Sequence, residues 1–167
     1  MSSRVMHSYP IDSEALYNML INKEYIAQKY EAIGAKNILF LEHGEKDNQF
    51  IVKTERIVSA NIPSFAKKFL NPSSTIIQTE IWHLSNDPVK KSDVEVVGKG
   101  LPFAISMKGN NTIQPENEGC QNIFEFDIHV GIPLVGGKIA SFLKEEGLKS
   151  GEQEYQFNLN YIKSRCV

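Results

Sequence analysis

The segment 122–130 constrains the fold of this chain more than any other feature. Its side chains alternate without a break, as they do in a strand with one face buried and one face in solvent. The apolar face carries Phe124, Phe126, Ile128 and Val130, and the polar face carries Glu125, Asp127 and His129. A glycine-rich connection at 131–137 follows, and then a charged segment with apolar residues at helical spacing. We therefore expect a strand that leads into a terminal helix, and such a helix needs a sheet to cover.

The rest of the chain supplies that sheet. A strand at 5–9 is followed by two short helices, the first with Asp12 or Ser13 as N-cap and the second over 23–32. Further strands are expected at 37–42, 49–59, 75–84, 94–101, 103–108 and 122–130, with 112–114 as a continuation of the sheet edge, a short amphipathic piece at 64–70 and a final helix over 135–164. Turn-forming residues at 44–48, 85–88, 109–111 and 115–119 separate most strands, which favours antiparallel neighbours. The prediction is an α+β fold with a curved antiparallel sheet of about seven strands.

Length and composition exclude several classes of protein. A chain of 167 residues is about one domain, so we expect a single domain over 1–167. Its net charge of −2 gives no bulk attraction for nucleic acid or for an anionic membrane. No apolar run approaches the ~18 residues of a transmembrane span, and the N-terminus lacks a signal-peptide core. Cys120 and Cys166 are too few for a zinc or Cys-x-x-Cys site and fit a reducing cytoplasm. We therefore expect a cytoplasmic protein without metal or other cofactor.

The final helix carries two glycines, Gly147 and Gly151, on the same stripe as Ala140, Leu143 and Tyr155. Each glycine costs a helix about 1 kcal/mol relative to alanine. Two interpretations stay open. In one the helix breaks between the two glycines, in the other the missing side chains leave space between helix and sheet, and both hold together if the helix kinks over a cavity.

The parity of the strands predicts which side chains face that helix. We expect them to enclose a cavity that binds a ligand. The predicted ligand-binding residues are Phe50, Val52, Thr54, Ile77, Thr79, Ile81, His83, Phe103, Ile105, Met107, Phe124, Phe126, Ile128, Leu143, Gly147 and Gly151. A few polar groups among apolar walls are typical of sites that orient a small molecule.

His83 shares its predicted stripe with Ile77, Thr79 and Ile81, so the sequence places its ring at the inner wall. A neutral, hydrogen-bonded core histidine and a ligand-contacting or proton-transferring histidine both fit this position. Arg56 can pair with an ordinary surface acid or with an anionic ligand group.

Glu125, Asp127 and His129 form the densest group of metal-ligand side chains in the sequence. Their neighbours of opposite parity are all large and apolar, so we expect these three on the solvent face with no metal. Trp82, Phe65 and Phe69 fit packing of the 64–70 piece against the sheet better than an aromatic platform. No hydrolase or protease signature is present, and no catalytic residue is predicted.

Two segments of the sequence resemble a known superfamily. Residues 56–82, with IPSFAKKF at 62–69 and QTEIW at 78–82, and IPLVGGK at 132–138 are similar to a bacterial family of uncharacterised START-like proteins. The resemblance implies the helix-grip fold, in which a long C-terminal helix crosses a curved sheet. Similar chains often carry an acid after the Gly-Gly-Lys-Ile string, where this chain has Ala140. The resemblance implies no established activity.

Three hypotheses follow. The first is a binding or carrier protein for an apolar or amphipathic, lipid-like molecule held between the sheet and the last helix. The second is an enzyme of cyclase or hydratase type that uses His83 or Arg56 in the same pocket. The third is a structural or interaction module with a filled core. The sequence does not indicate an oligomeric state.

Overall fold

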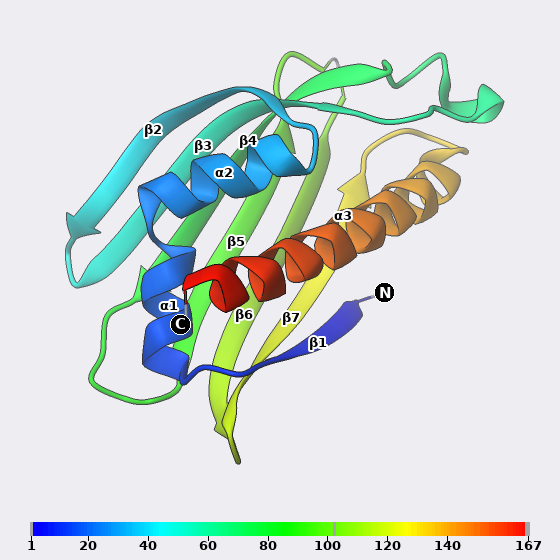
Figure 1. Cartoon of the computed structure of the whole chain (residues 1–167). Coiled ribbons are helices and arrows are strands. Elements are labelled where there is room, and N and C mark those ends of the chain that lie inside the picture. Colours follow the sequence, from blue (N-terminus) through cyan, green and yellow to red (C-terminus); the bar gives the residue numbers. More distant parts are fainter. Residues whose placement is uncertain (1, 102, 166–167) are drawn as a thin grey trace.

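The computed structural model describes residues 2–101 and 103–165 and shows an α+β fold of the helix-grip type. Seven antiparallel strands form one sheet in the order β1-β7-β6-β5-β4-β3-β2. The α-helices all lie on one face of this curved sheet, and α3 runs across it (Figure 1). We call the helix-covered face of the sheet the inner face and the opposite one the outer face.

The elements follow the predicted order. Their bounds are β1 Ser3–Tyr9, α1 Ser13–Leu20, α2 Lys23–Ala32, β2 Lys36–Lys46, β3 Gln49–Ser59, the 3₁₀ turn η1 Ser64–Ala66, β4 Ser73–His83, β5 Lys90–Gly98, β6 Ile105–Glu116, β7 Gly119–Val130 and α3 Gly136–Arg165. Each of the first two helices begins at a side chain that accepts a backbone hydrogen bond. Asp12 accepts one from Ala15 N at 2.8 Å, and Asn22 accepts one from Tyr25 N at 2.9 Å.

The turn predicted at 109–111 is wrong, because β6 is one continuous strand of 12 residues. Gly109 lies inside it, paired with Phe126 of β7. A Cβ at this glycine would come within 2.4 Å of the carbonyl oxygen of Glu125 and within 2.9 Å of the ring of Phe124. The absence of a Cβ at Gly109 therefore allows β6 and β7 to approach closely, and the glycine does not mark a turn.

The final helix is also continuous. It runs over 30 residues through both Gly147 and Gly151, so the interpretation of a broken helix is wrong. Packing at its two ends offsets the low helix propensity of the glycines. Ile139 near its start and Ile162 near its end are both buried against other elements.

Most of the buried apolar side chains among the described residues belong to one of three clusters. The first gathers around Leu16, Trp82 and Ile162, where α1 and the end of α3 meet the sheet. The second lies under α2 and includes Tyr25 and Val52. The third is at the far end and joins η1 to the start of α3; its buried members are Ala66, Leu70, Ile132 and Ile139.

Cys120 is a buried free thiol, whereas Cys166 lies outside the described residues. Within 2–101 and 103–165, no helix is both long and apolar enough to cross a membrane.

Candidate functional site

Strand register determines which side chains point toward the helices. Val52 of β3 pairs with Glu80 of β4, Glu80 pairs with Val94 of β5, and the same line continues through Gly109 to Phe126. Because Val52 packs under α2, all residues of this line belong to the inner face. The inner face thus carries Phe50, Val52, Thr54 and Arg56 from β3, Ile76, Gln78, Glu80 and Trp82 from β4, Val94 and Val96 from β5, Ile105 and Met107 from β6, and Phe124, Phe126 and Ile128 from β7.

Most of the predicted lining has the expected orientation. Eight of the predicted residues lie on the inner face, namely Phe50, Val52, Thr54, Ile105, Met107, Phe124, Phe126 and Ile128. Phe103 and Leu143 pack in the third cluster, at the end where α3 begins. Contact of these residues with a ligand stays a prediction.

The expected orientation of β4 is wrong. Ile77, Thr79, Ile81 and His83 lie on the outer face, and Gln78, Glu80 and Trp82 occupy the inner one. The side chain of His83 is 49% exposed, and its Nε2 lies 3.1 Å from Oδ2 of Asp93. Trp82, by contrast, is 1% exposed. This strand is apolar on both faces, and polar Gln78 and Glu80 face inward because charged partners from β3 and α2 meet them there.

The sheet-facing line of α3 differs slightly from the predicted stripe. Three buried residues, Ile139, Asn158 and Ile162, define the side of α3 that faces the sheet. Between them on the same side lie Leu143, Glu146, Ser150 and Glu154. Gly147 is exposed and lies beside this line, while Gly151 is half-buried. A Cβ at either glycine would meet nothing within 4 Å. The small residue that faces the sheet at the middle of α3 is therefore Ser150 rather than Gly147.

The middle of the inner face lies outside the three buried clusters. Its apolar residues are Val94, Val96, Met107, Phe126 and Ile128, which we call the central patch. Val96, Met107 and Ile128 are only half-buried, although helices cover this face. The part of α3 between its two packed ends presents Glu146, Ser150 and Glu154, none of which is apolar. The apolar side chains of the central patch thus face a stretch of α3 whose sheet-facing side chains are polar and include the small Ser150.

A cluster of charged residues adjoins the central patch on the side of α2. Lys29 is buried, and its Nζ lies 3.2 Å from Oε1 of Glu154 on α3. Nζ of Lys29 lies 4.5 Å from the centre of the Tyr30 ring, and Cζ of Arg56 lies 3.7 Å from the same centre. Arg56 also donates to Oε1 of Gln78 at 2.8 Å. We call Lys29, Arg56, Glu80 and Glu154 the charged cluster.

Burial shifts the pKa values in this cluster. It raises the pKa of the Glu80 carboxyl above its usual value; Lys29 and Arg56 oppose this shift, and Glu154 adds to it. Burial by itself would lower the pKa of Lys29, but Glu154 and the neighbouring Tyr25, Tyr30 and Glu80 raise it well above its usual value. The cluster thus stabilises the charged form of one ammonium and makes one carboxyl lose its proton less readily than an exposed glutamate does.

A second polar network ties three elements together beside the charged cluster. The Tyr25 hydroxyl donates to Oδ1 of Asn158, and Nδ2 of Asn158 donates to the Tyr9 hydroxyl at 3.1 Å. Burial raises the pKa of Tyr9 to about 12, so its hydroxyl stays protonated. This network fixes the C-terminal half of α3 against α2 and β1.

Two surface depressions are lined by described residues, and neither is the enclosed cavity predicted from the sequence. One, of about 580 Å³, lies between the end of α2 and α3, over Ala32, Ile33, Gly34, Glu152, Gln153, Gln156 and Phe157. Lys29 is one turn before Ile33, and Glu154 lies within the α3 stretch. Lys29 and Glu154 do not line this depression, but they belong to the two helices that border it. The other, of about 850 Å³, surrounds the hairpin between β6 and β7.

Glu125, Asp127 and His129 lie exposed on the outer face, as their alternation predicts. Among the residues that the structure describes, no group of three or more His, Cys, Asp or Glu is arranged to hold a metal ion.

Sequence reasoning missed Lys29, Glu80 and Glu154 as site residues. One signal was available: Lys29 occupies the middle of the apolar stripe of α2, between Tyr25, Ile26 and Ile33. A lysine at such a position needs a buried partner. Nothing in the sequence identified Glu154 as that partner.

Solved structures share this fold at low sequence identity. A protein of Thermus thermophilus superposes with a TM-score of 0.62 at 12% identity, covering 93% of this chain and 92% of that one. A START superfamily protein from Mycobacterium smegmatis has a TM-score of 0.55 at 11% identity, covering 96% and 98%. A STAR-related lipid transfer protein from Xanthomonas axonopodis has a TM-score of 0.52 at 16% identity, covering 83% and 77%. These similarities make the fold START-like.

The sequence comparisons define the family. No curated protein matches the sequence. Residues 4–162 match the family described as protein of unknown function, DUF2505. That match spans nearly the whole chain, and this protein therefore belongs to the DUF2505 family.

Proposed function

We propose that residues 1–167 act as one START-like domain that binds an apolar or amphipathic, lipid-like small molecule. The molecule would lie between the central patch and the middle of α3. One observation carries the proposal: the first and third buried clusters sit at the two ends of α3, and Val96, Met107 and Ile128 of the central patch between them stay only half-buried opposite a stretch of α3 that carries Ser150 instead of a large apolar side chain. An apolar ligand would cover that patch.

The charged cluster gives the site a polar end. A ligand with a hydrogen-bonding or anionic head group would reach Arg56 and Lys29, while its apolar part covers Met107 and Ile128. The depression between α2 and α3 would give access, because it lies between the same two helices that the Lys29–Glu154 ion pair joins. The names of two structural neighbours, a START superfamily protein and a STAR-related lipid transfer protein, agree with a lipid-like ligand. The reduced thiol of Cys120 is in keeping with a carrier located in the cytoplasm.

A titration with a fluorescent fatty acid tests this function. Delipidated protein would be mixed with 11-(dansylamino)undecanoic acid, and energy transfer from Trp82, the one tryptophan of the chain, would report binding. We expect saturable binding at one site per chain, with Arg56→Gln weakening it and Lys53→Gln, on the outer face of the same strand, leaving it unchanged. Absence of saturable binding to this probe and to uncharged and phosphorylated lipid analogues would refute the proposal.

A second candidate function rests on Glu80. Its inner-face position and raised pKa are typical of a general acid or base in a secluded site. This candidate replaces the enzyme hypothesis built on His83, which lies on the outer face. Turnover of a bound molecule that is lost in Glu80→Gln, with ligand affinity retained, would favour it.

A further inference from the structure

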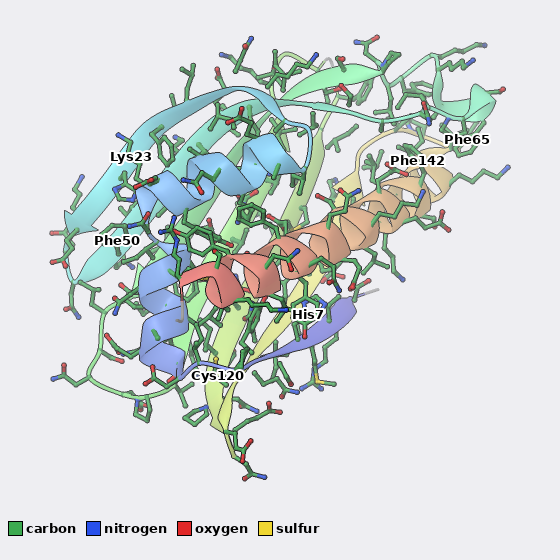
Figure 2. All side chains as sticks on the ribbon, viewed as in Figure 1. His7, Lys23, Phe50, Phe65, Cys120 and Phe142 are labelled. Atoms are coloured by element: carbon green, nitrogen blue, oxygen red, sulfur yellow. The ribbon has the colours of Figure 1, made fainter. Side chains whose placement is uncertain are left out.

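The end of the molecule where α3 begins has an unusual surface. The loop between β3 and β4 and the connection from β7 to α3 pack against each other there through the third cluster, with Ala66 and Leu70 from one and Ile132 and Ile139 from the other. Phe65 lies at this outer end, beyond Phe142 of α3 (Figure 2). The two connections therefore form one continuous tip.

Two large apolar side chains project from this tip. Leu134 is fully exposed, at 105% of its reference surface, and Phe65 is 40% exposed. The backbone of Leu134 has φ 70°, a left-handed conformation that leucine disfavours. The chain therefore holds this leucine outward at a conformational cost, although the protein itself gives its side chain no packing partner.

Three lysines lie in or directly after the same two connections as these side chains. Lys67 and Lys68 follow Phe65, and Lys138 Nζ lies 5.6 Å from the centre of the Phe65 ring. All three lysines are exposed, and the described residues place no carboxylate within ion-pair distance of them. Segments 60–72 and 131–144 contain no Asp or Glu, although the whole chain has a net charge of −2. The first turn of α3 has no acidic residue either, so the positive end of its dipole adds to the field.

We propose that this tip docks on the surface of a lipid bilayer that contains anionic lipids. Projecting apolar side chains together with exposed lysines on the same tip match such an interface, since the apolar groups enter the acyl boundary and the lysines meet the head groups. A protein partner would need a pocket shaped for Leu134, whereas a bilayer accepts any projecting apolar side chain. Docking here does not require an internal ligand, so it can hold or fail independently of the proposed function.

Co-sedimentation with vesicles tests the proposal. The full chain would be mixed with large unilamellar vesicles of phosphatidylcholine alone, or with one third phosphatidylglycerol, at low and at physiological salt. We expect binding to the anionic vesicles only, weaker at higher salt. Lys67→Glu with Lys68→Glu should weaken partitioning by at least about twentyfold, since each lysine near an anionic surface contributes about fivefold. Leu134→Asn, which tolerates the left-handed backbone, should weaken it by about tenfold.

The matched control is Lys46→Glu with Lys91→Glu, which makes the same change in net charge at exposed lysines outside the tip. It should bind like the wild type. The proposal is overturned if the wild-type protein does not sediment with the anionic vesicles at low salt. It is equally overturned if the control pair weakens binding as much as the tip pair, or if Leu134→Asn binds as the wild type does.

Discussion

Lys29 of α2 and Glu154 of α3 form an ion pair of 3.2 Å across the line where the two helices meet above the sheet. The two partners are unequally buried, with the lysine side chain 11% exposed and the glutamate 31%. Lys29 therefore depends on Glu154 for its charge compensation more than Glu154 depends on Lys29. The pair fixes α2 to α3 beside the depression that would admit a ligand.

Glu154→Gln should destabilise the protein by about 1–3 kcal/mol, because it leaves the buried ammonium of Lys29 without its carboxylate partner. Glu145→Gln, an exposed position of the same helix, should change the free energy of unfolding by less than about 0.5 kcal/mol. Urea denaturation followed by Trp82 fluorescence measures both. Equal effects of the two substitutions would show that the ion pair contributes nothing.

The raised pKa of Lys29 predicts a pH dependence. A group with a folded-state pKa above its unfolded value contributes stability that is fully present below the unfolded pKa of about 10.5 and is lost as pH rises through the folded value. The wild-type protein should therefore lose stability at strongly alkaline pH, and Lys29→Met should lose less over the same range. Thermal unfolding between about pH 10 and pH 12, which starts just below the unfolded pKa of Lys29, tests this difference.

Glu80 has the opposite effect on stability. Its folded-state pKa is raised by burial, so the folded protein holds the proton more tightly than the unfolded chain does. Stability should then fall as pH rises from about 4.5 through the raised pKa. Glu80→Gln should raise the melting temperature at pH 7 and reduce this loss, whereas Glu125→Gln on the outer face should do neither. A lower melting temperature for Glu80→Gln at pH 7 would mean that the charged carboxylate stabilises the fold.

Cys120 should be inert in the folded protein. Burial raises the pKa of its thiol to about 11, so almost no thiolate forms at neutral pH. In a Cys166→Ser background, a thiol reagent at pH 8 should label Cys120 only at the rate of unfolding. Labelling as rapid as that of a free peptide thiol would contradict its burial.

Leu134→Gly should stabilise the protein by about 0.5–1 kcal/mol. Glycine removes the cost of a left-handed leucine, and no packing is lost, although glycine gives the unfolded chain more freedom. Leu148→Gly, at a partly exposed position within α3, should instead destabilise by about 1 kcal/mol. Chemical denaturation of the two variants gives the comparison, and a destabilised Leu134→Gly would mean that the leucine side chain has a structural role.

The order of helices and strands was predictable because the alternation typical of strands and the apolar spacing typical of helices are both clear in this sequence. Alternation marks β3 and β7, and side-chain caps mark the starts of α1 and α2. The orientation of β4 was not predictable from its own residues, since Ile77 and Ile81 on one face are as apolar as Ile76 and Trp82 on the other. The long connection between β3 and β4 leaves their register open, and a slip of one residue exchanges the two faces.

The candidate site was predictable only in its apolar half. Met107, Phe126 and Ile128 follow from strand parity. The charged cluster depends on contacts between α2, α3 and two strands, and no local pattern in the sequence pairs Lys29 with a residue more than a hundred positions away. The glycines of α3 were a misleading signal for space between the helix and the sheet. The helical phase, and not the size of a residue, decides which positions face the sheet.

The central claim is that the space between the central patch and the middle of α3 holds a lipid-like molecule. Native mass spectrometry of freshly purified protein tests it most directly, with two variants that place the same side chain on α3. Ser150→Leu puts a leucine on the sheet-facing line, and Gly147→Leu puts one beside that line, where a Cβ meets nothing within 4 Å. The account predicts lipid-mass adducts on the wild type and on Gly147→Leu, and at least about fivefold fewer on Ser150→Leu, which corresponds to about 1 kcal/mol of lost binding free energy. Bare polypeptide mass for all three proteins, or undiminished adducts on Ser150→Leu, would contradict it.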